Sequence, residues 1–155
     1  MLETARPSPL SPYGVTKLAA EHLCMLYHAN YAVPTVAVRY FTVYGPRQRP
    51  DMAFHRFLRG ILANEPLSLY GDGEQTRDFT FVEDAVAATI AAAEHGTNGT
   101  IYNVGGGSRV SMNEILDVMA QCTGKNPDVH RHETQRGDMR DTFADTTRAR
   151  KELGF

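Results

Sequence analysis

The stretch Ser11-Pro12-Tyr13-Gly14-Val15-Thr16-Lys17 places a tyrosine and a lysine four residues apart at the start of an apolar-periodic segment. Ser11 is suited to cap a helix and Pro12 to occupy its first turn, so we predict a helix that runs to about Asn30. Tyr13 and Lys17 then share one helical face. An ammonium group one turn away favours the phenolate, which could take a proton from a substrate hydroxyl. The same spacing also arises by chance on many helices.

The rest of the chain alternates strand-like and helix-like segments, which is typical of an α/β protein. β-Branched and aromatic runs predict strands at residues 35–40, 67–70, 77–82, 100–104 and 128–133. Periodicity and capping residues predict helices at residues 53–64, 83–94 and 111–124, and between Asp145 and Gly154. Residues 42–52 are predicted to form a loop beyond the first strand, where open α/β sheets bind their ligands.

The first predicted helix carries an apolar stripe, which consists of Val15, Ala19, Leu23 and Leu26. Such a stripe should pack on a neighbouring element, and the small alanine allows a close approach. If part of that packing surface is absent from the chain, the exposed apolar patch should find another surface. We therefore expect a homo-oligomer.

Composition limits the classes of function. Hydrophobic residues make up 42% of the 155 residues and charged residues 22%, enough for the core of a globular protein. The net charge of −2 predicts no bulk attraction to nucleic acid or membrane. Cys24 and Cys122 are far apart and lack metal-ligand spacing, so neither a metal site nor a disulfide is predicted. A soluble, cytoplasmic protein is the expectation.

Residues 13–21 resemble the active-site helix of extended short-chain dehydrogenases/reductases that act on nucleotide sugars. Further stretches at residues 39–48, 70–79 and 102–107 follow in the order found in that family, and so do Gly137-Asp138 and Ala144-Asp145. Ordered motifs along nearly the whole chain are far more specific than one tyrosine and lysine pair. The chain thus resembles NAD-dependent nucleotide-sugar epimerases and dehydratases. Residues 41–53 are most similar to the UDP-glucuronate 4-epimerase branch.

The resemblance implies an α/β fold in which the end of a Rossmann-like domain, residues 1–52, carries the catalytic helix. Residues 53–155 would mainly form a small substrate-binding domain. No Gly-x-Gly-x-x-Gly fingerprint for a dinucleotide precedes Tyr13. Gly105–Gly107 come too late for it and are interpreted as a close turn, not as a phosphate cradle. The N-terminal dinucleotide-binding half is therefore expected to be missing, with an incomplete NAD site and Met1 as an imposed start.

The resemblance also assigns roles to single residues. Tyr13 would move the proton and Lys17 would hold the nicotinamide ribose, with Tyr40 and Phe41 also beside the cofactor. The residues implied in substrate binding are Thr42, Arg49, Arg56, Tyr70, Arg77, Arg136 and Asp138.

Among these residues, Thr42 and Arg49 would hold the carboxylate of the sugar. Arg77 would grip the diphosphate, because a guanidinium binds phosphate oxygens in a bidentate fork. Alternatives stay open for three of the arginines. Arg49 could pair only with Asp51, Arg77 with Asp78 or Glu83, and Arg56 could be plain solvated surface. The match of Arg136 could also be displaced by one residue.

The expected function is 4-epimerisation of a UDP-sugar, UDP-glucuronate in particular, through a 4-keto intermediate. The chain alone is expected to be inactive. Two other functions stay open: a nucleotide-sugar 4,6-dehydratase or decarboxylase, and a sugar-nucleotide-binding remnant without catalysis.

Overall fold

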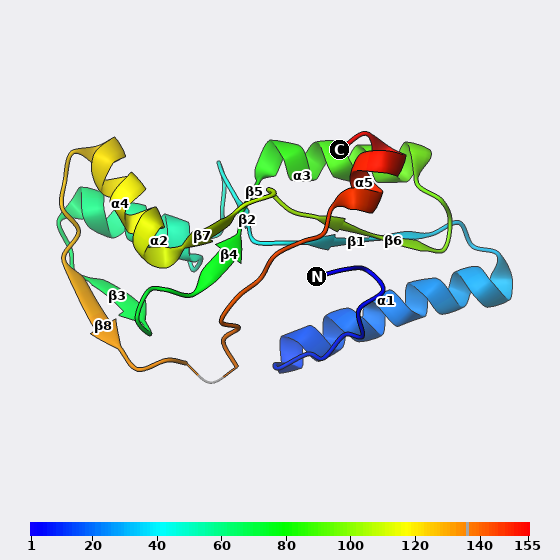
Figure 1. Ribbon diagram of the computed structural model, residues 1–155, viewed down its shortest axis with the longest axis horizontal. Helices are drawn as coiled ribbons and strands as arrows, with labels where there is room; N and C mark the ends of the chain where they lie inside the picture. The colour runs from blue at the N-terminus through cyan, green and yellow to red at the C-terminus, as the bar shows by residue number, and fades with distance from the viewer. Residues whose placement is uncertain (136) are drawn as a thin grey trace.

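The computed structural model describes residues 1–135 and 137–155, which form helices and short strands in two adjoining regions (Figure 1). The helices are α1 Pro12–Tyr31, α2 Ala53–Ala63, α3 Val82–His95, α4 Met112–Thr123 and α5 Thr147–Leu153. The strands are β1 Val36–Tyr40, β2 Val43–Tyr44, β3 Leu67–Tyr70, β4 Thr76–Asp78, β5 Thr80–Phe81, β6 Thr100–Val104, β7 Arg109–Ser111 and β8 Val129–His132. The predicted α/β fold is confirmed. No helix in these two ranges is long and apolar enough to cross a membrane.

The first region is built around β1 and β6, which pair in parallel from Val36 opposite Thr100 to Tyr40 opposite Val104. Helices α3 and α5 lie on one side of this pair and α1 lies on the other (Figure 1). Its core is the buried cluster of Ala92, Tyr102, Ala149 and Leu153.

The second region contains the parallel pair of β3 and β8, with α2 and α4 packed beside it (Figure 1). Its core is apolar throughout and consists of Phe57, Ile61, Leu67, Leu69, Met112, Ile115, Leu116 and Met119. Two further pairs, β2 with β5 and β4 with β7, lie between the regions (Figure 1). The division of the chain at residue 52 stays a prediction, although α3, β6 and α5 from beyond that point lie beside β1.

Local signals explain where the helices begin. The Ser11 hydroxyl accepts a hydrogen bond from Gly14 N at 3.1 Å, and Pro12 occupies the first helical position of α1, as predicted. At α4, Ser111 and Glu114 exchange hydrogen bonds in the expected capping box. Thr146 stands at the N-cap of α5, while the Asp145 carboxylate accepts from Thr147 N at 2.9 Å.

A buried carboxylate joins three distant segments between the two regions. Asp78 Oδ1 accepts hydrogen bonds from Gly106 N at 2.7 Å and Gly107 N at 3.2 Å, and Oδ2 accepts from Ala144 N at 2.9 Å. Asp78 is fully buried. A Cβ at Gly106 would collide with the carbonyl of Phe79, so a side chain there is excluded. The glycines therefore form a close turn around an internal carboxylate, which confirms the interpretation made from the sequence.

Several strand boundaries differ from the predictions. The predicted strand at residues 77–82 divides at Phe79 into β4 and β5, and Val82 already begins α3. The strands β2 and β7 were missed. Each is only two or three residues long and is defined by pairing with a strand far away in sequence.

The apolar stripe predicted on α1 does not face the sheet. Val15, Leu23 and Leu26 are 50–56% exposed. The partly buried positions are Gly14, Leu18, Glu21, Met25 and His28, which recur at helical spacing. The stripe therefore forms the exposed apolar patch that was expected on this helix, and a polar residue, Glu21, occupies the middle of the sheet-facing side.

We expect Asp78→Asn to lower the free energy of unfolding by roughly 1–3 kcal/mol, because the amide NH₂ cannot accept the hydrogen bonds that the carboxylate accepts. Urea unfolding followed by circular dichroism measures the change. Asp117→Asn, on the exposed side of α4, is the matched control and should stay within about 0.5 kcal/mol of the wild type. Equal stability of the two variants would contradict the role assigned to Asp78.

Candidate functional site

Tyr13 and Lys17 line one cavity of about 570 Å³ between α1 and β1. The Lys17 ammonium lies 5.5 Å from the centroid of the Tyr13 ring, so the predicted common face is confirmed. Tyr13 is 70% exposed and therefore open to a ligand. A phenol with a neighbouring cation can donate or accept a proton, which is the chemistry that this arrangement offers.

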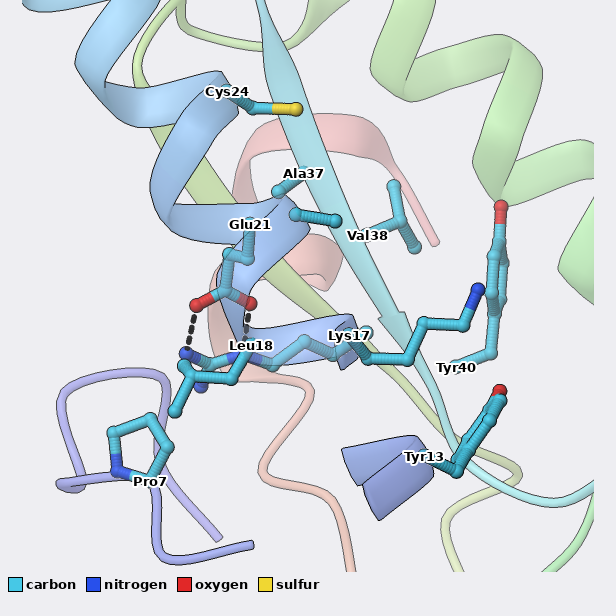
Figure 2. A pocket seen from close by; sticks show the side chains of 11 residues that line it. Pro7, Tyr13, Lys17, Leu18, Glu21, Cys24, Ala37, Val38 and Tyr40 are labelled. Atoms are coloured by element: carbon cyan, nitrogen blue, oxygen red, sulfur yellow. Dashed lines mark hydrogen bonds and ion pairs between the residues drawn. The ribbon is translucent and has the colours of Figure 1, made fainter. Parts of the chain in front are cut away.

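Tyr40, at the end of β1, lines the same cavity. Figure 2 shows the Lys17 side chain extending toward Tyr40, with Tyr13 close by. The Tyr40 hydroxyl lies 2.6 Å from Thr89 Oγ1, which in turn donates to Ala85 O. This hydrogen bond to α3 fixes one wall of the cavity. Phe41, the next residue, donates from its backbone N to Val104 O at 2.9 Å and so continues the pairing of β1 with β6.

An ion pair that was not predicted also borders this cavity. Arg39 Nε and Nη2 each lie 2.7 Å from an oxygen of Glu21, and the two side chains are 25% and 14% exposed. Arg39 Nη1 donates as well to Glu3 O at 3.3 Å. The hydrogen bond with Glu21 raises the pKa of Arg39 above its ordinary value. One sequence signal pointed to Arg39, because it is a charged residue in an otherwise apolar strand, but nothing in the sequence identified Glu21 as its partner.

A second cavity, of about 300 Å³, brings together residues that are far apart in sequence. Among the predicted substrate residues, those that line it are Thr42, Arg56, Tyr70, Arg77 and Asp138. Thr42 lies two residues after Tyr40, so the two cavities adjoin along the chain. Arg136 lies outside the described residues, and its predicted role is not assessed by the structure.

Arg77 is held in this second cavity by polar contacts on one edge of its guanidinium. Nη2 forms an ion pair with Asp138 at 2.5 Å, and Nη1 donates to Thr76 O at 2.9 Å and to Arg140 O at 3.3 Å. The alternative pairing of Arg77 with Asp78 or Glu83 is wrong, because Asp78 is committed to the glycine turn and the ion pair is formed with Asp138. Arg77 and Asp138, which were both predicted to bind the substrate, are thus in direct contact with each other.

Arg49 forms an ion pair with Asp51 inside its own loop, with distances of 3.1 Å from Nε and 2.8 Å from Nη2. The two side chains are 74% and 65% exposed. Asp51 lines the second cavity, whereas Arg49 is not among its lining residues. The alternative pairing is therefore present, and a role of Arg49 in binding a carboxylate stays a prediction.

The site does not resemble a metal centre. Within residues 1–135 and 137–155, no group of three or more His, Cys, Asp and Glu side chains could hold a metal ion. The residues that line the two cavities instead carry phenols, hydroxyls, amides, a thiol, cations and the carboxylates of Glu21, Asp51 and Asp138.

Known proteins are similar to this chain in sequence and fold. The sequence profile of the NAD dependent epimerase/dehydratase family matches residues 1–105. A UDP-glucuronate 4-epimerase of Thermodesulfobacterium geofontis is 40% identical over 149 residues, which are 96% of this chain and 46% of that protein. An uncharacterized UDP-glucose epimerase of Bacillus subtilis, YtcB, is 41% identical over 99% of this chain and 49% of its own length.

The crystal structure of a UDP-glucuronic acid 4-epimerase from Bacillus cereus, in complex with UDP-glucuronic acid and NAD, is similar to the whole chain. Its TM-score is 0.94 at 46% identity, over 98% of this chain and 49% of that one. The chain thus spans about half the length of the relatives it matches. The family profile covers more than half of the chain, and the matches extend over nearly all of it. The chain belongs to the NAD-dependent epimerase/dehydratase family.

Proposed function

We propose that the chain is the proton-transfer and substrate-binding part of an NAD-dependent 4-epimerase that acts on a UDP-sugar, with UDP-glucuronate as the substrate. The observation that carries the proposal is that two cavities are lined by nearby residues of the chain, Tyr40 in the first and Thr42 in the second. One contains the Tyr13 and Lys17 pair, and the other contains two arginines, a tyrosine and a hydroxyl. A phenol beside a cation-lined cavity suits a hydroxylated sugar attached to a diphosphate.

The chemistry of the first cavity fits the nicotinamide end of NAD. Lys17 would hold the ribose hydroxyls, and Tyr40 would border the ring. The bound cofactor supplies the oxidation and re-reduction of the sugar at C4. Tyr13 would accept the proton of the C4 hydroxyl and return it to the same oxygen after the sugar has turned. The Lys17 ammonium lies beside this phenol, 5.5 Å from the centroid of the Tyr13 ring.

The second cavity supports binding of UDP. Arg56 and Arg77 supply cations, and a guanidinium suits the planar pairs of oxygens on a diphosphate. Tyr70, at the end of β3, offers an aromatic ring beside which the uracil can lie. An incoming phosphate would share or replace Asp138 as the partner of Arg77. The similarity to UDP-glucuronate 4-epimerases also favours UDP as the nucleotide part of the ligand.

Binding of a uronate needs compensation for its carboxylate, which is costly to bury without a cation or a hydrogen-bond donor. Thr42 lines the cavity and can donate from its hydroxyl. Arg49 would join it by leaving Asp51, and an exposed ion pair of this kind is worth only about 0–1 kcal/mol. The cost of exchanging partners is therefore small compared with the gain from a buried charge-assisted hydrogen bond.

Two other functions stay open. A nucleotide-sugar 4,6-dehydratase or decarboxylase would use the same cavities, and a non-catalytic remnant would bind the nucleotide without turnover. Titration of the chain with UDP, UDP-sugars and NAD, together with a turnover assay, distinguishes them.

We expect the 155-residue chain to bind UDP but not to turn over a UDP-sugar with NAD, since its glycine triplet is engaged by Asp78 and cannot cradle a pyrophosphate. Isothermal titration measures UDP binding. Arg77→Met should weaken it by roughly 1.5–3 kcal/mol, the range for a hydrogen bond to a charged group. Tyr13→Phe is the control and should bind UDP as the wild type does. Unchanged binding by Arg77→Met would remove the second cavity from the proposal, and turnover by the chain alone would refute the expected inactivity.

The charge of the sugar is tested by comparing UDP-glucuronate with UDP-glucose. In Arg49→Met, binding of the uronate should weaken by roughly 1.5–3 kcal/mol and binding of the neutral sugar far less. Arg47→Met is the matched control, because it removes one exposed cation from the same loop without touching the second cavity. Equal losses for both sugars would show that Arg49 serves the diphosphate or the fold, and the assignment to glucuronate would fall.

The exposed face of α1 supports self-association. Val15, Leu23, Leu26 and Tyr27 are each at least half exposed, and contiguous apolar surface tends to be covered. We expect a dimer or larger assembly by light scattering at micromolar concentration. Leu23→Glu combined with Leu26→Glu should shift it to monomer, whereas Leu62→Glu, at an equally exposed leucine on α2, should not. A monomeric wild type would contradict this expectation.

A further inference from the structure

Three charged or phenolic residues follow one another along α1 at intervals of four: Tyr13, Lys17 and Glu21. Residues at this spacing are neighbours on a helix, so Lys17 and Glu21 are placed to form an ion pair. They do not form one, because both oxygens of Glu21 are bound by Arg39. In the part of the chain that the structure describes, the ion pairs within 4.0 Å do not include Lys17.

The preference of Glu21 for Arg39 has a physical basis. An exposed lysine and glutamate pair on one helix is worth about 0.2–0.5 kcal/mol, and the order with lysine first is the weaker one. Arg39 binds both carboxylate oxygens in a planar fork, at a position that is largely shielded from water. A third donor of the same guanidinium is held by Glu3 O, which limits its movement. Arg39 therefore wins the competition for the carboxylate.

The side chains of Lys17 and Glu21 accordingly point in different directions. Figure 2 shows Lys17 extending toward Tyr40, while Glu21 is turned away from it and is held by two contacts. The Lys17 ammonium is left to the Tyr13 ring, 5.5 Å from its centroid.

We propose that Arg39 is a positioning residue: by holding Glu21, it keeps the Lys17 ammonium free of a carboxylate and available beside Tyr13. This inference rests on the proposed function only in the use that it gives to Lys17. Without Arg39, the Glu21 carboxylate is partly buried and unpaired. Lys17, one helical turn away, is then the only lysine or arginine on the same helix as Glu21. Glu21 would capture it.

If the ion pair between Arg39 and Glu21 has a purely structural role, a different effect on Lys17 is expected. If the pair only fastens α1 to β1, removing either partner or both has the same effect on Lys17. If Arg39 acts by occupying Glu21, loss of Arg39 alone changes Lys17, and removing the carboxylate as well reverses that change.

Trace acetylation of the 155-residue chain with N-hydroxysuccinimidyl acetate at pH 8, quantified by mass spectrometry, distinguishes the two roles. The chain has three lysines, so Lys125 and Lys151 serve as internal references. Arg39→Met should slow acetylation of Lys17 by about 1.4- to 2.3-fold, the ratio that corresponds to one ion pair at this helical spacing. In Glu21→Gln, and in the double variant that combines Arg39→Met with Glu21→Gln, Lys17 should be acetylated at the wild-type rate.

Circular dichroism verifies that each variant is folded. If Arg39→Met is unfolded, Arg39→Gln, which also lacks the charge but keeps hydrogen-bond donors, is labelled in its place with the same expectation. Equal labelling of Lys17 in the wild type and the folded Arg39 variant would overturn the proposal. Equal slowing in the single and double variants would overturn it too. The assay needs neither NAD nor a sugar nucleotide, so its outcome is independent of whether the proposed function holds.

Discussion

The carboxylate of Asp78 is the contact on which the arrangement of the two regions depends. It is fully buried and accepts hydrogen bonds from the glycine turn after β6 and from Ala144, the segment that leads into α5. A buried charge is tolerated only when such donors surround it, so the three segments must meet in one geometry. Arg77 precedes Asp78 in β4, and its side chain lines the second cavity. The internal hydrogen bonds of Asp78 thereby fix the position of β4, from which the Arg77 guanidinium reaches the second cavity.

Much of the fold could be predicted from the sequence because its signals are local. Ser11 with Pro12, and Ser111 with Glu114, mark helix starts through contacts within four residues. Short strands such as β2 and β7 carry no comparable signal. They exist because Thr80 and Thr76, far away in the chain, offer pairing partners. On α1, apolar periodicity identifies a stripe, but it does not show which surface covers that stripe.

The candidate site divides in the same way. Tyr13 and Lys17 are one helical turn apart, so their proximity follows from the helix alone. Thr42, Tyr70 and Arg77 meet in one cavity only through the tertiary fold, because Thr42 lies between β1 and β2, Tyr70 ends β3 and Arg77 lies in β4. Motif order suggested this meeting, and spacing could not show it. The partners of the charged residues were least predictable. Arg77 pairs with Asp138, 61 residues later, and Arg39 pairs with Glu21, 18 residues earlier. Ion pairs between distant segments produce no periodic pattern in the sequence.

The position of α1 in this chain rests on polar contacts more than on apolar burial. None of its residues is buried, so α1 obtains little of the roughly 25 cal/mol per Å² that apolar burial provides. Glu21 is among its least exposed positions and is bound to β1 through Arg39, which also reaches the backbone at Glu3. Glu3 in turn accepts a hydrogen bond from Asn103 N in β6. A continuous polar chain thus runs from the helix that carries Tyr13 to both strands beneath it. Because directional contacts of this kind tolerate little displacement, they can hold the phenol of Tyr13 in register even though no residue of its helix is buried.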